Sequence, residues 1–156
     1  LIPLSTEQQV GQYQRLESIV AVTKADPKQG RKVFQTKCAQ CHQLFGEGKQ
    51  LGPPLDGYER GNLAFWINNL VAPSAEIREG YQTFRALTDD GRVITGTVAQ
   101  QDTAKVVLRT DQDQLITLPK DQLEQFGPVS ISLMPEGLLK DLTDQQIADL
   151  MSYLRL

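Results

Sequence analysis

The run Cys38-Ala39-Gln40-Cys41-His42 decides how this chain is interpreted. It contains both cysteines and the only histidine of the 156 residues. Two thiols and an imidazole so close together indicate a single chemical site. The spacing is that of a c-type haem attachment, in which Cys38 and Cys41 form thioethers with the porphyrin and His42 binds the iron. The motif therefore predicts one covalent haem c, with its iron, as the cofactor.

Three other chemistries remain open for this motif, and each lacks something that it needs. A structural zinc site usually takes four protein ligands as two Cys/His pairs, and the chain has no second pair. A thioredoxin-like dithiol follows a strand, whereas the residues before Cys38 have a helical pattern. A disulfide between Cys38 and Cys41 would close a small loop and stabilise little. A chance match with no cofactor is the remaining alternative.

The composition and net charge indicate which kinds of partner the chain is not suited to bind. Hydrophobic residues make up 40% of the chain, which is enough for a buried core, and the net charge is −3. This charge and the lack of a basic stripe argue against nucleic acid as a partner. The longest apolar stretches are too short to cross a bilayer, so no transmembrane segment is expected in this chain. The start Leu1-Ile2-Pro3-Leu4 has no initiator Met, which indicates a processed protein or an excised domain.

Capping signals and apolar spacing predict four helices, three in the first half of the chain and one at its C-terminal end. Ser5 and Thr6 each precede a glutamine by three residues, which is the capping-box spacing. Asp26-Pro27 is a second helix start, and Thr143 with Gln146 is a third. The predicted helices cover 6–23, Asp26 to Cys38, 63–71, and Thr143 to Leu154.

The segment between the third and last helices predicts short strands. Valine, isoleucine and threonine are frequent there, and Asp89-Asp90-Gly91 is a hairpin signal. The glycine- and proline-rich residues 45–55 are instead predicted to be irregular and able to lie flat against a planar ligand. The predicted strands cover 81–88, 92–99, 105–110 and 114–118, and together they form an antiparallel meander.

The second axial ligand of the iron is expected to be a methionine. With only one histidine, ligation by two histidines is excluded. Met151 lies on the apolar stripe of the last predicted helix, where methionine is most simply a core residue. Met134 lies in a non-helical segment that Pro135 stiffens, and it is the preferred ligand.

Several residues are expected around the haem. A carbonyl near Pro53 is expected to accept a hydrogen bond from His42 and so fix its ring. Pro53 and Leu55 belong to the loop expected beside the haem. Tyr58, Arg60 and Trp66 are candidate donors for the haem propionates, and Trp66 can alternatively serve as an apolar wall.

Several motifs, in this order along the chain, resemble a class I cytochrome c. They are Gly30-x-x-x-Phe34, Cys38-x-x-Cys41-His42, Gly52-Pro53-x-Leu55, Met134-Pro135 and the ending from Leu142 to Leu154. The resemblance covers about 26–78 and 128–156. It implies a mainly α cytochrome c fold in which the first and last family helices cross at Gly30 and Phe34 against Tyr153. His42 and Met134 are too far apart for the compact form of the family, and the strand-rich segment accounts for the excess.

The intervening residues resemble a narrower group, the haem-binding domains of planctomycetes and verrucomicrobia. The motifs are Pro73-Ser74-Ala75-Glu76-Ile77, Gly80-Tyr81, Asp90-Gly91-Arg92, Gly96 and Ser132-Leu133-Met134-Pro135. The resemblance implies an N-terminal helical extension (1–25), a discontinuous haem domain (26–78 and 128–156) and an inserted antiparallel β subdomain (79–127). It also implies an extracytoplasmic location, periplasmic or secreted, and a possible place at the C-terminal end of a larger protein.

The function expected from these residues is one-electron transfer rather than enzyme catalysis. With His42 and Met134 both on the iron, no small molecule binds there readily, and the protein tunes and orients the haem. The expected partner is a redox protein or a fused dehydrogenase-type domain. Displacement of Met134 would instead allow a gas sensor or a peroxide-reactive haem protein. A third hypothesis makes the β insert an adhesion or docking module.

Overall fold

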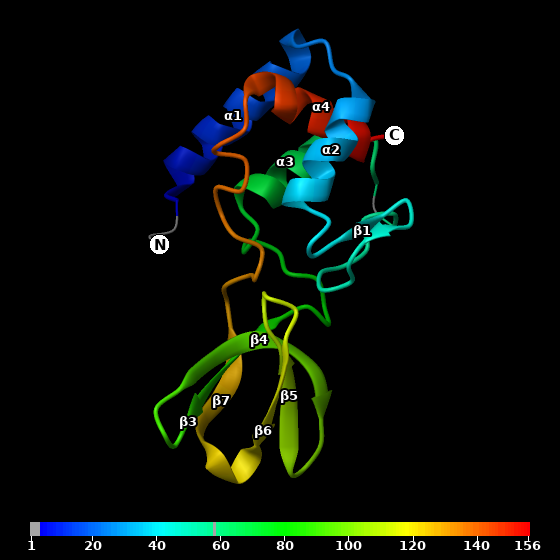
Figure 1. Cartoon of the computed structure of the whole chain (residues 1–156). Helices are drawn as coiled ribbons and strands as arrows, with labels where there is room; N and C mark the ends of the chain where they lie inside the picture. Colours follow the sequence, from blue (N-terminus) through cyan, green and yellow to red (C-terminus); the bar gives the residue numbers. More distant parts are fainter. Residues whose placement is uncertain (1–3, 58) are drawn as a thin grey trace. The chain divides into compact units, whose positions relative to one another are not determined.

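The computed structural model describes residues 4–57 and 59–156, and it divides the chain into two compact units. Unit 1 consists of Leu1–Glu76 and Pro135–Leu156, and unit 2 consists of Ile77–Met134. Within the described residues, unit 1 holds four α-helices and a two-stranded hairpin, and unit 2 holds a five-stranded sheet (Figure 1). Unit 2 therefore lies between the third and fourth helices in the sequence. Tyr58, one of the candidate haem neighbours, lies outside the described residues.

The helices of unit 1 begin and end close to where the sequence predicts them. In chain order the elements of unit 1 are α1 (Thr6–Val22), α2 (Pro27–Lys37), β1 (Gln43–Leu44), β2 (Glu47–Gly48), α3 (Leu63–Val71) and α4 (Asp144–Leu154). All four predicted helices are thus confirmed, with ends that differ by about one residue.

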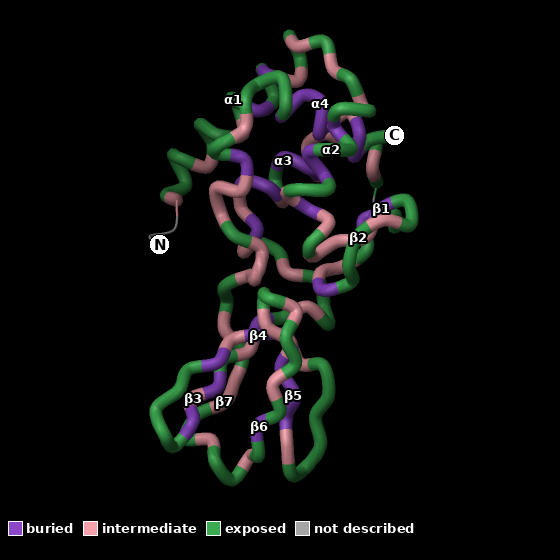
Figure 2. Tube along the Cα trace, viewed as in Figure 1, coloured by how far each residue is buried: buried purple, intermediate pink, exposed green. Residues whose placement is uncertain are grey.

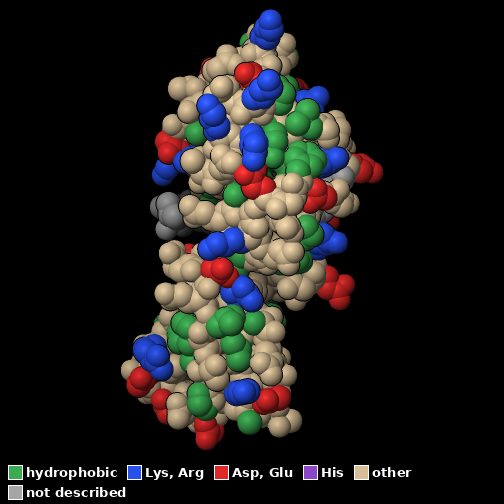
Figure 3. Space-filling model, turned by 45° about the vertical axis from the view of Figure 1, so that its right-hand side comes forward, with side chains coloured by type: hydrophobic (Ala, Val, Ile, Leu, Met, Phe, Trp, Pro, Cys, Tyr) green, Lys and Arg blue, Asp and Glu red, His purple; other side chains and the backbone are tan. Residues whose placement is uncertain are grey.

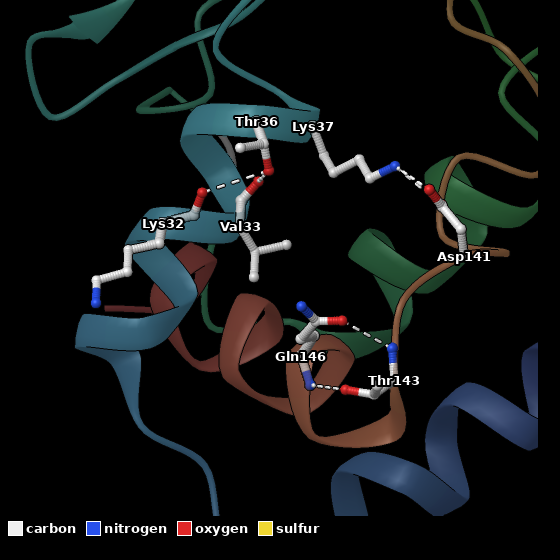
Figure 4. Close-up of polar contacts among 7 residues, drawn as sticks. All are labelled: Lys32, Val33, Thr36, Lys37, Asp141, Thr143 and Gln146. Atoms are coloured by element: carbon white, nitrogen blue, oxygen red, sulfur yellow. Dashed lines mark hydrogen bonds and ion pairs between the residues drawn. The ribbon is translucent and has the colours of Figure 1, made fainter.

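The predicted capping residues start three of these helices. Ser5 accepts from the backbone N–H of Gln8, whose side chain accepts from Ser5 in return. Thr143 and Gln146 make the same reciprocal pair at α4 (Figure 4). Asp26 caps α2 by accepting from the N–H of Lys28. Each cap satisfies N–H groups that a helix start leaves unpaired.

The crossing of α2 and α4 forms the centre of unit 1. Gly30 allows it, because a Cβ at this position would overlap the carbonyl oxygen of Asp149. Phe34 is fully buried there, and its ring centroid lies 5.5 Å from that of Tyr153. Figure 2 shows buried residues concentrated along α3, α4 and the inner part of α2. Met151 is also fully buried in α4, which confirms its expected place in the core.

Polar contacts also hold α2 and α4 together. The carboxylate of Asp149, which is only 4% exposed, accepts from the backbone N–H of Asp26 at 2.7 Å. At the other end of α2, the ammonium of Lys37 lies 2.9 Å from the carboxylate of Asp141, in the segment that leads into α4 (Figure 4). Both ends of α2 are therefore bonded to α4 or to its approach.

Helix α1 packs against α3 and α4 through Leu16 and Ile19, which are both buried. Arg15 on its outer side forms an exposed ion pair with Asp144, with 3.1 Å between nitrogen and oxygen. An exposed pair of this kind contributes little to stability. The apolar contacts are therefore the main attachment of α1.

One correction concerns residues 45–55, which the sequence predicts to be irregular throughout. Strands β1 and β2 pair antiparallel, with Gln43 opposite Gly48 and Leu44 opposite Glu47. The two residues at the tip, Phe45 and Gly46, both have positive φ, at 51° and 77°. A two-residue turn with this geometry connects strands closely. Phenylalanine is unusual in that conformation, so the sequence carries no ordinary hairpin signal.

Unit 2 is an antiparallel sheet with the strand order β6-β5-β4-β3-β7. Its elements are β3 (Thr83–Thr88), β4 (Val93–Gln101), β5 (Lys105–Arg109), β6 (Leu115–Pro119), the 3₁₀ turn η1 (Lys120–Gln122) and β7 (Leu123–Val129). The four predicted strands are confirmed. Strand β7 is an additional strand that was not predicted, and it pairs with β3 at the edge of the sheet.

Alternating side chains from these strands form a separate core. Ala86, Val106, Leu108 and Leu118 are almost fully buried in it, together with Ile94. Partly buried aromatic and aliphatic residues surround this cluster. Among them, the rings of Phe84 and Phe126 stack with centroids 5.4 Å apart. Unit 2 therefore has its own hydrophobic centre.

The surface carries charges of both signs. On the face that Figure 3 shows, Lys and Arg side chains alternate with Asp and Glu, and hydrophobic side chains gather in patches between them. Among the described residues, no helix is long and apolar enough to span a bilayer.

Candidate functional site

The Cys-x-x-Cys-His motif lies in a tight turn at the end of α2. Cys38 caps the helix, and its N–H donates to the carbonyl of Phe34 at 2.9 Å. The N–H groups of Cys41 and His42 both donate to the carbonyl of Cys38, at 3.1 and 2.8 Å. These bonds bring the two cysteines and the histidine together within one turn. Neither cysteine forms a disulfide.

The state of Cys38 argues against a redox dithiol. Its side chain is buried, and desolvation is the largest cause that raises the pKa of this thiol to about 12. The neighbouring Cys41 raises it further, while Lys37 opposes the shift. Reactive dithiols of the Cys-x-x-Cys type depend on a lowered pKa. Cys38 therefore stays protonated at neutral pH and is unsuited to that chemistry.

The zinc alternative also loses support. Among residues 4–57 and 59–156, no group of three or more His, Cys, Asp or Glu side chains could hold a metal ion. A structural zinc site needs four such ligands. No carboxylate in the described part of the chain completes a zinc shell around Cys38, Cys41 and His42.

The imidazole of His42 is held in a defined protonation state. Its Nδ1 lies 2.7 Å from the carbonyl oxygen of Pro53, which is the contact that the sequence predicts. A carbonyl oxygen can only accept, so Nδ1 carries the proton and Nε2 keeps its lone pair. Burial lowers the pKa of His42, and the bond to Pro53 opposes this shift without reversing it. A neutral ring with a free Nε2 is the form that binds a metal.

Gly52 makes room for this ring. A Cβ at Gly52 would lie 2.7 Å from Cε1 of His42 and 3.0 Å from its Nδ1. The backbone of Gly52 therefore lies directly against the imidazole. Gly48 is similarly constrained, because it has φ of +106° and a Cβ there would overlap the carbonyl oxygen of His42.

Backbone hydrogen bonds tie the loop after the motif back to the motif itself. The N–H of Gly52 donates to Cys41 at 2.6 Å, and that of Lys49 donates to Ala39 at 2.9 Å. The N–H of Leu55 donates to Gln43 at 2.8 Å. These three bonds preorganise the segment around His42, so that ligand orientation does not depend on one contact alone.

Sequence reasoning missed the part that Phe45 and Asp56 take in this arrangement. The carboxylate of Asp56 accepts from the N–H of Phe45 at 3.0 Å. The ring of Phe45 packs edge-on against Tyr153, with centroids 5.5 Å apart, and the guanidinium of Arg60 lies 4.7 Å above it. A glycine after a bulky residue is the only sequence signal for this turn.

The remaining candidate residues are divided between the two units of the chain. Leu55 and Trp66 are buried, and Pro53 and Arg60 are half-buried, all in unit 1. The indole N–H of Trp66 donates to the backbone carbonyl of Arg60 at 2.8 Å, so this donor already has a partner. Met134 is the last residue of unit 2, whereas His42 belongs to unit 1. The N–H of Met134 donates to the hydroxyl of Ser132 at 3.1 Å.

The residues of unit 1 fit a covalently attached haem. Two cysteines lie in the same turn as a neutral imidazole whose Nε2 is available, and glycine backbone supports the ring from behind. Covalent haem would use both thiols as thioethers. It requires neither the lowered cysteine pKa of a redox dithiol nor the additional metal ligands of a zinc site. The observed chemistry of the donor set thus agrees with the haem hypothesis and not with its rivals.

Comparison with known proteins gives the same result. A family model described as cytochrome c matches residues 27–108, more than half of the chain. The chain is 34% identical to the cytochrome c of Ginkgo biloba over 77 residues, which are 46% of this chain and 68% of that protein. It is 54% identical over 33 residues to the cytochromes c of Cochliobolus lunatus and Arabidopsis thaliana. Those shorter matches cover 20% of this chain and only 31% and 30% of the relatives.

Helix α1 precedes the matched residues, and the match runs from α2 past Glu76 into the strands of unit 2. Proteins of the matched family bind haem c covalently and act as electron carriers. The chain belongs to the cytochrome c family.

Proposed function

We propose that this chain is a monohaem electron carrier that transfers one electron at a time. The observation that carries the proposal is the His42 arrangement, with its proton fixed on Nδ1 by Pro53 and its ring supported by Gly52. When bound, haem iron supplies the change between ferric and ferrous states. The residues of the chain hold, orient and bury that group.

Cys38 and Cys41 are the proposed covalent attachment points. Their sulfurs would hold the haem as thioethers to its two vinyl groups. Burial of Cys38 supports a structural role for its sulfur, because a thioether, like a protonated thiol, carries no charge into the interior.

Met134 is the proposed second axial ligand. Met151 is fully buried within α4, which leaves Met134 as the other methionine of the chain. Met134 lies outside helices and strands, and its N–H is bonded to Ser132, two residues earlier. Pro135 follows it and restricts the backbone. A thioether ligand favours ferrous iron and raises the reduction potential.

Residues of the loop after the motif are the proposed haem surroundings. Leu55 and Pro53 would provide apolar contacts, and Trp66 would serve as a wall, because its N–H donates to a carbonyl. Arg60 and Tyr58 are the proposed donors for the propionates. The guanidinium of Arg60 is half-exposed, which suits a group at the edge of the site.

The wider assignments follow from the sequence resemblance. We assign the chain to the planctomycete and verrucomicrobial group, with a haem domain at 26–78 and 128–156, an insert at 79–127 and an extension at 1–25. Its location would be periplasmic or secreted, since haem c is attached outside the cytoplasm. Its partner would be a redox protein or a fused dehydrogenase-type domain.

Optical spectra of the haem-loaded protein test the ligand assignment. We expect a low-spin reduced spectrum and a weak far-red ferric band from thioether ligation. Met134→Ala should remove that band, open the sixth position to carbon monoxide and lower the potential. The matched control is Met151→Leu, which changes the other methionine and should leave the spectrum unchanged.

Two outcomes would contradict the assignment. Loss of the far-red band in Met151→Leu with no change in Met134→Ala would exchange the roles of the two methionines. A high-spin spectrum that reacts with carbon monoxide in the unmodified protein would favour the gas sensor or peroxide-reactive alternative.

A further inference from the structure

An open groove of about 400 Å³ lies on unit 2, beside the edge strand β7. It is formed by β3, the start of β4 and β7. The principal lining residues are Arg85, Leu87, Val93, Phe126, Gly127 and Val129. The cytochrome function proposed above makes no use of this groove.

Arg85 is the charged group of the groove that has no partner. Its side chain is exposed, and it makes no hydrogen bond or ion pair with any residue in 4–57 or 59–156. Two other arginines of unit 2 do have carboxylate partners. Arg92 lies 3.2 Å from Asp90, and Arg109 lies 2.8 Å from Asp113. Arg85 therefore offers an available guanidinium where these arginines do not.

Gly127 leaves space next to this guanidinium. It pairs with Arg85 across β3 and β7, and a Cβ at Gly127 would meet no atom within 4 Å. A side chain from another molecule can therefore approach Arg85 over the backbone of Gly127. A carboxylate suits the position, because a guanidinium binds it through two parallel hydrogen bonds.

Apolar side chains flank the cation. Val93 is 61% exposed, and it pairs across the strands with the half-buried Leu87. On the other side of Arg85 along the sheet, Val129 of β7 pairs with Thr83 and adds further apolar surface. A single arginine among such residues does not suit nucleic acid, which needs several cations along the groove. It suits one carboxylate with apolar groups on either side.

The position beside β7 indicates the shape of the ligand. Strand β7 is an edge strand, so one side of its backbone has no neighbouring strand in the sheet. Extended peptides bind at such edges, and their alternate side chains then point to the same face. Pro128 lacks an N–H and therefore limits how far a regular ladder could extend along this edge.

We propose that this groove binds an extended segment of a partner protein, which presents an Asp or Glu to Arg85 between two apolar side chains. In an extended chain these three side chains occupy positions i, i+2 and i+4. The carboxylate pairs with the guanidinium over Gly127, one apolar neighbour covers Leu87 and Val93, and the other covers Val129. The inference is independent of the haem ligands, because none of its residues is a proposed ligand of the iron.

The probe is a displayed library of random seven-residue peptides, selected on the haem-loaded protein. Enriched peptides should carry an acidic residue with apolar residues two positions before and after it. Arg85→Gln should weaken their binding about tenfold or more, because a charge-assisted pair is lost. Arg85→Lys should have an intermediate effect. The matched control Arg92→Gln removes an arginine that is already paired, and it should leave binding unchanged.

Three results would overturn the proposal. The first is that no peptide is enriched more strongly on the unmodified protein than on the Arg85→Gln variant. The second is that the enriched peptides lack an acidic residue. The third comes from sedimentation of the protein alone. A dimer that dissociates on Arg85→Gln would assign the groove to a second copy of the chain. Because Arg85 is exposed, the variant should unfold like the unmodified protein, and a denaturation curve checks this.

Discussion

The substitution Gly52→Ala tests the geometry of the His42 site most sharply. The added Cβ would lie 2.7 Å from Cε1 of His42, whereas ordinary contact begins at about 3.4 Å. The ring must therefore move by about 0.7 Å. A shift of this size strains or breaks the 2.7 Å hydrogen bond between Nδ1 and Pro53. Overpacking costs about 1–3 kcal/mol and a lost hydrogen bond about 0.5–1.5 kcal/mol.

We therefore expect Gly52→Ala to lower the free energy of unfolding by about 2–4 kcal/mol. The assay is urea unfolding of the haem-loaded protein, followed by haem absorbance, with the reduction potential measured alongside. Gly57→Ala is the matched control in the same loop, because a Cβ at Gly57 would meet nothing within 4 Å. The reasoning is refuted if the two variants unfold within about 0.5 kcal/mol of each other and share one potential.

Three further predictions concern the remainder of the structure. Gly30→Ala forces a Cβ into a backbone carbonyl at the crossing of α2 and α4 and should lower the free energy of unfolding by about 3 kcal/mol or more. Gly11→Ala, in open space on α1, should instead raise it by about 0.5–1 kcal/mol. Thermal unfolding of the two variants tests this difference. Hydrogen bonding to Arg31 lowers the pKa of Glu47, so the stability from this pair is present above pH 4.5 and is lost as the pH falls through the lowered pKa. Carboxyl NMR titration should place the Glu47 midpoint below 4.5, and Arg31→Gln should raise it. The hydroxyl of Thr83 is buried without a partner among the described residues, so Thr83→Val should leave stability unchanged or raise it by about 1 kcal/mol, and a loss in urea unfolding would contradict this.

The helices could be predicted because their boundaries are encoded locally. Ser5, Asp26 and Thr143 each begin a helix through a side-chain bond to a backbone N–H two or three residues later. Such signals need no knowledge of the tertiary structure. The start of α2 could therefore be predicted from Asp26-Pro27, and its end was predicted to within about one residue.

Strand β7 could not be predicted for a physical reason. Gly127-Pro128 is ordinarily a break in regular structure, because proline cannot donate to a sheet ladder. Here the proline lies on an edge strand, where one side of the backbone needs no partner. The pairing with β3 is a long-range contact and has no local signal.

The candidate site shows the same division between local and tertiary information. The motif identified Cys38, Cys41 and His42, and the loop composition identified the carbonyl of Pro53. The support given to His42 by Gly48 and Gly52 depends on how the loop folds back, which the sequence alone does not specify. The Phe45 turn depends on Asp56 and Tyr153, which lie far from it in the sequence.

The most direct test of the central claim is the mass of the Cys38–Lys49 peptide. Trypsin cuts after Lys37 and Lys49 and so releases the whole motif on one peptide. In protein matured with the haem-attachment machinery, we predict that the denatured chain keeps the mass of one haem and that this peptide carries it. A peptide with two unmodified thiols from fully matured protein would contradict covalent haem at Cys38 and Cys41.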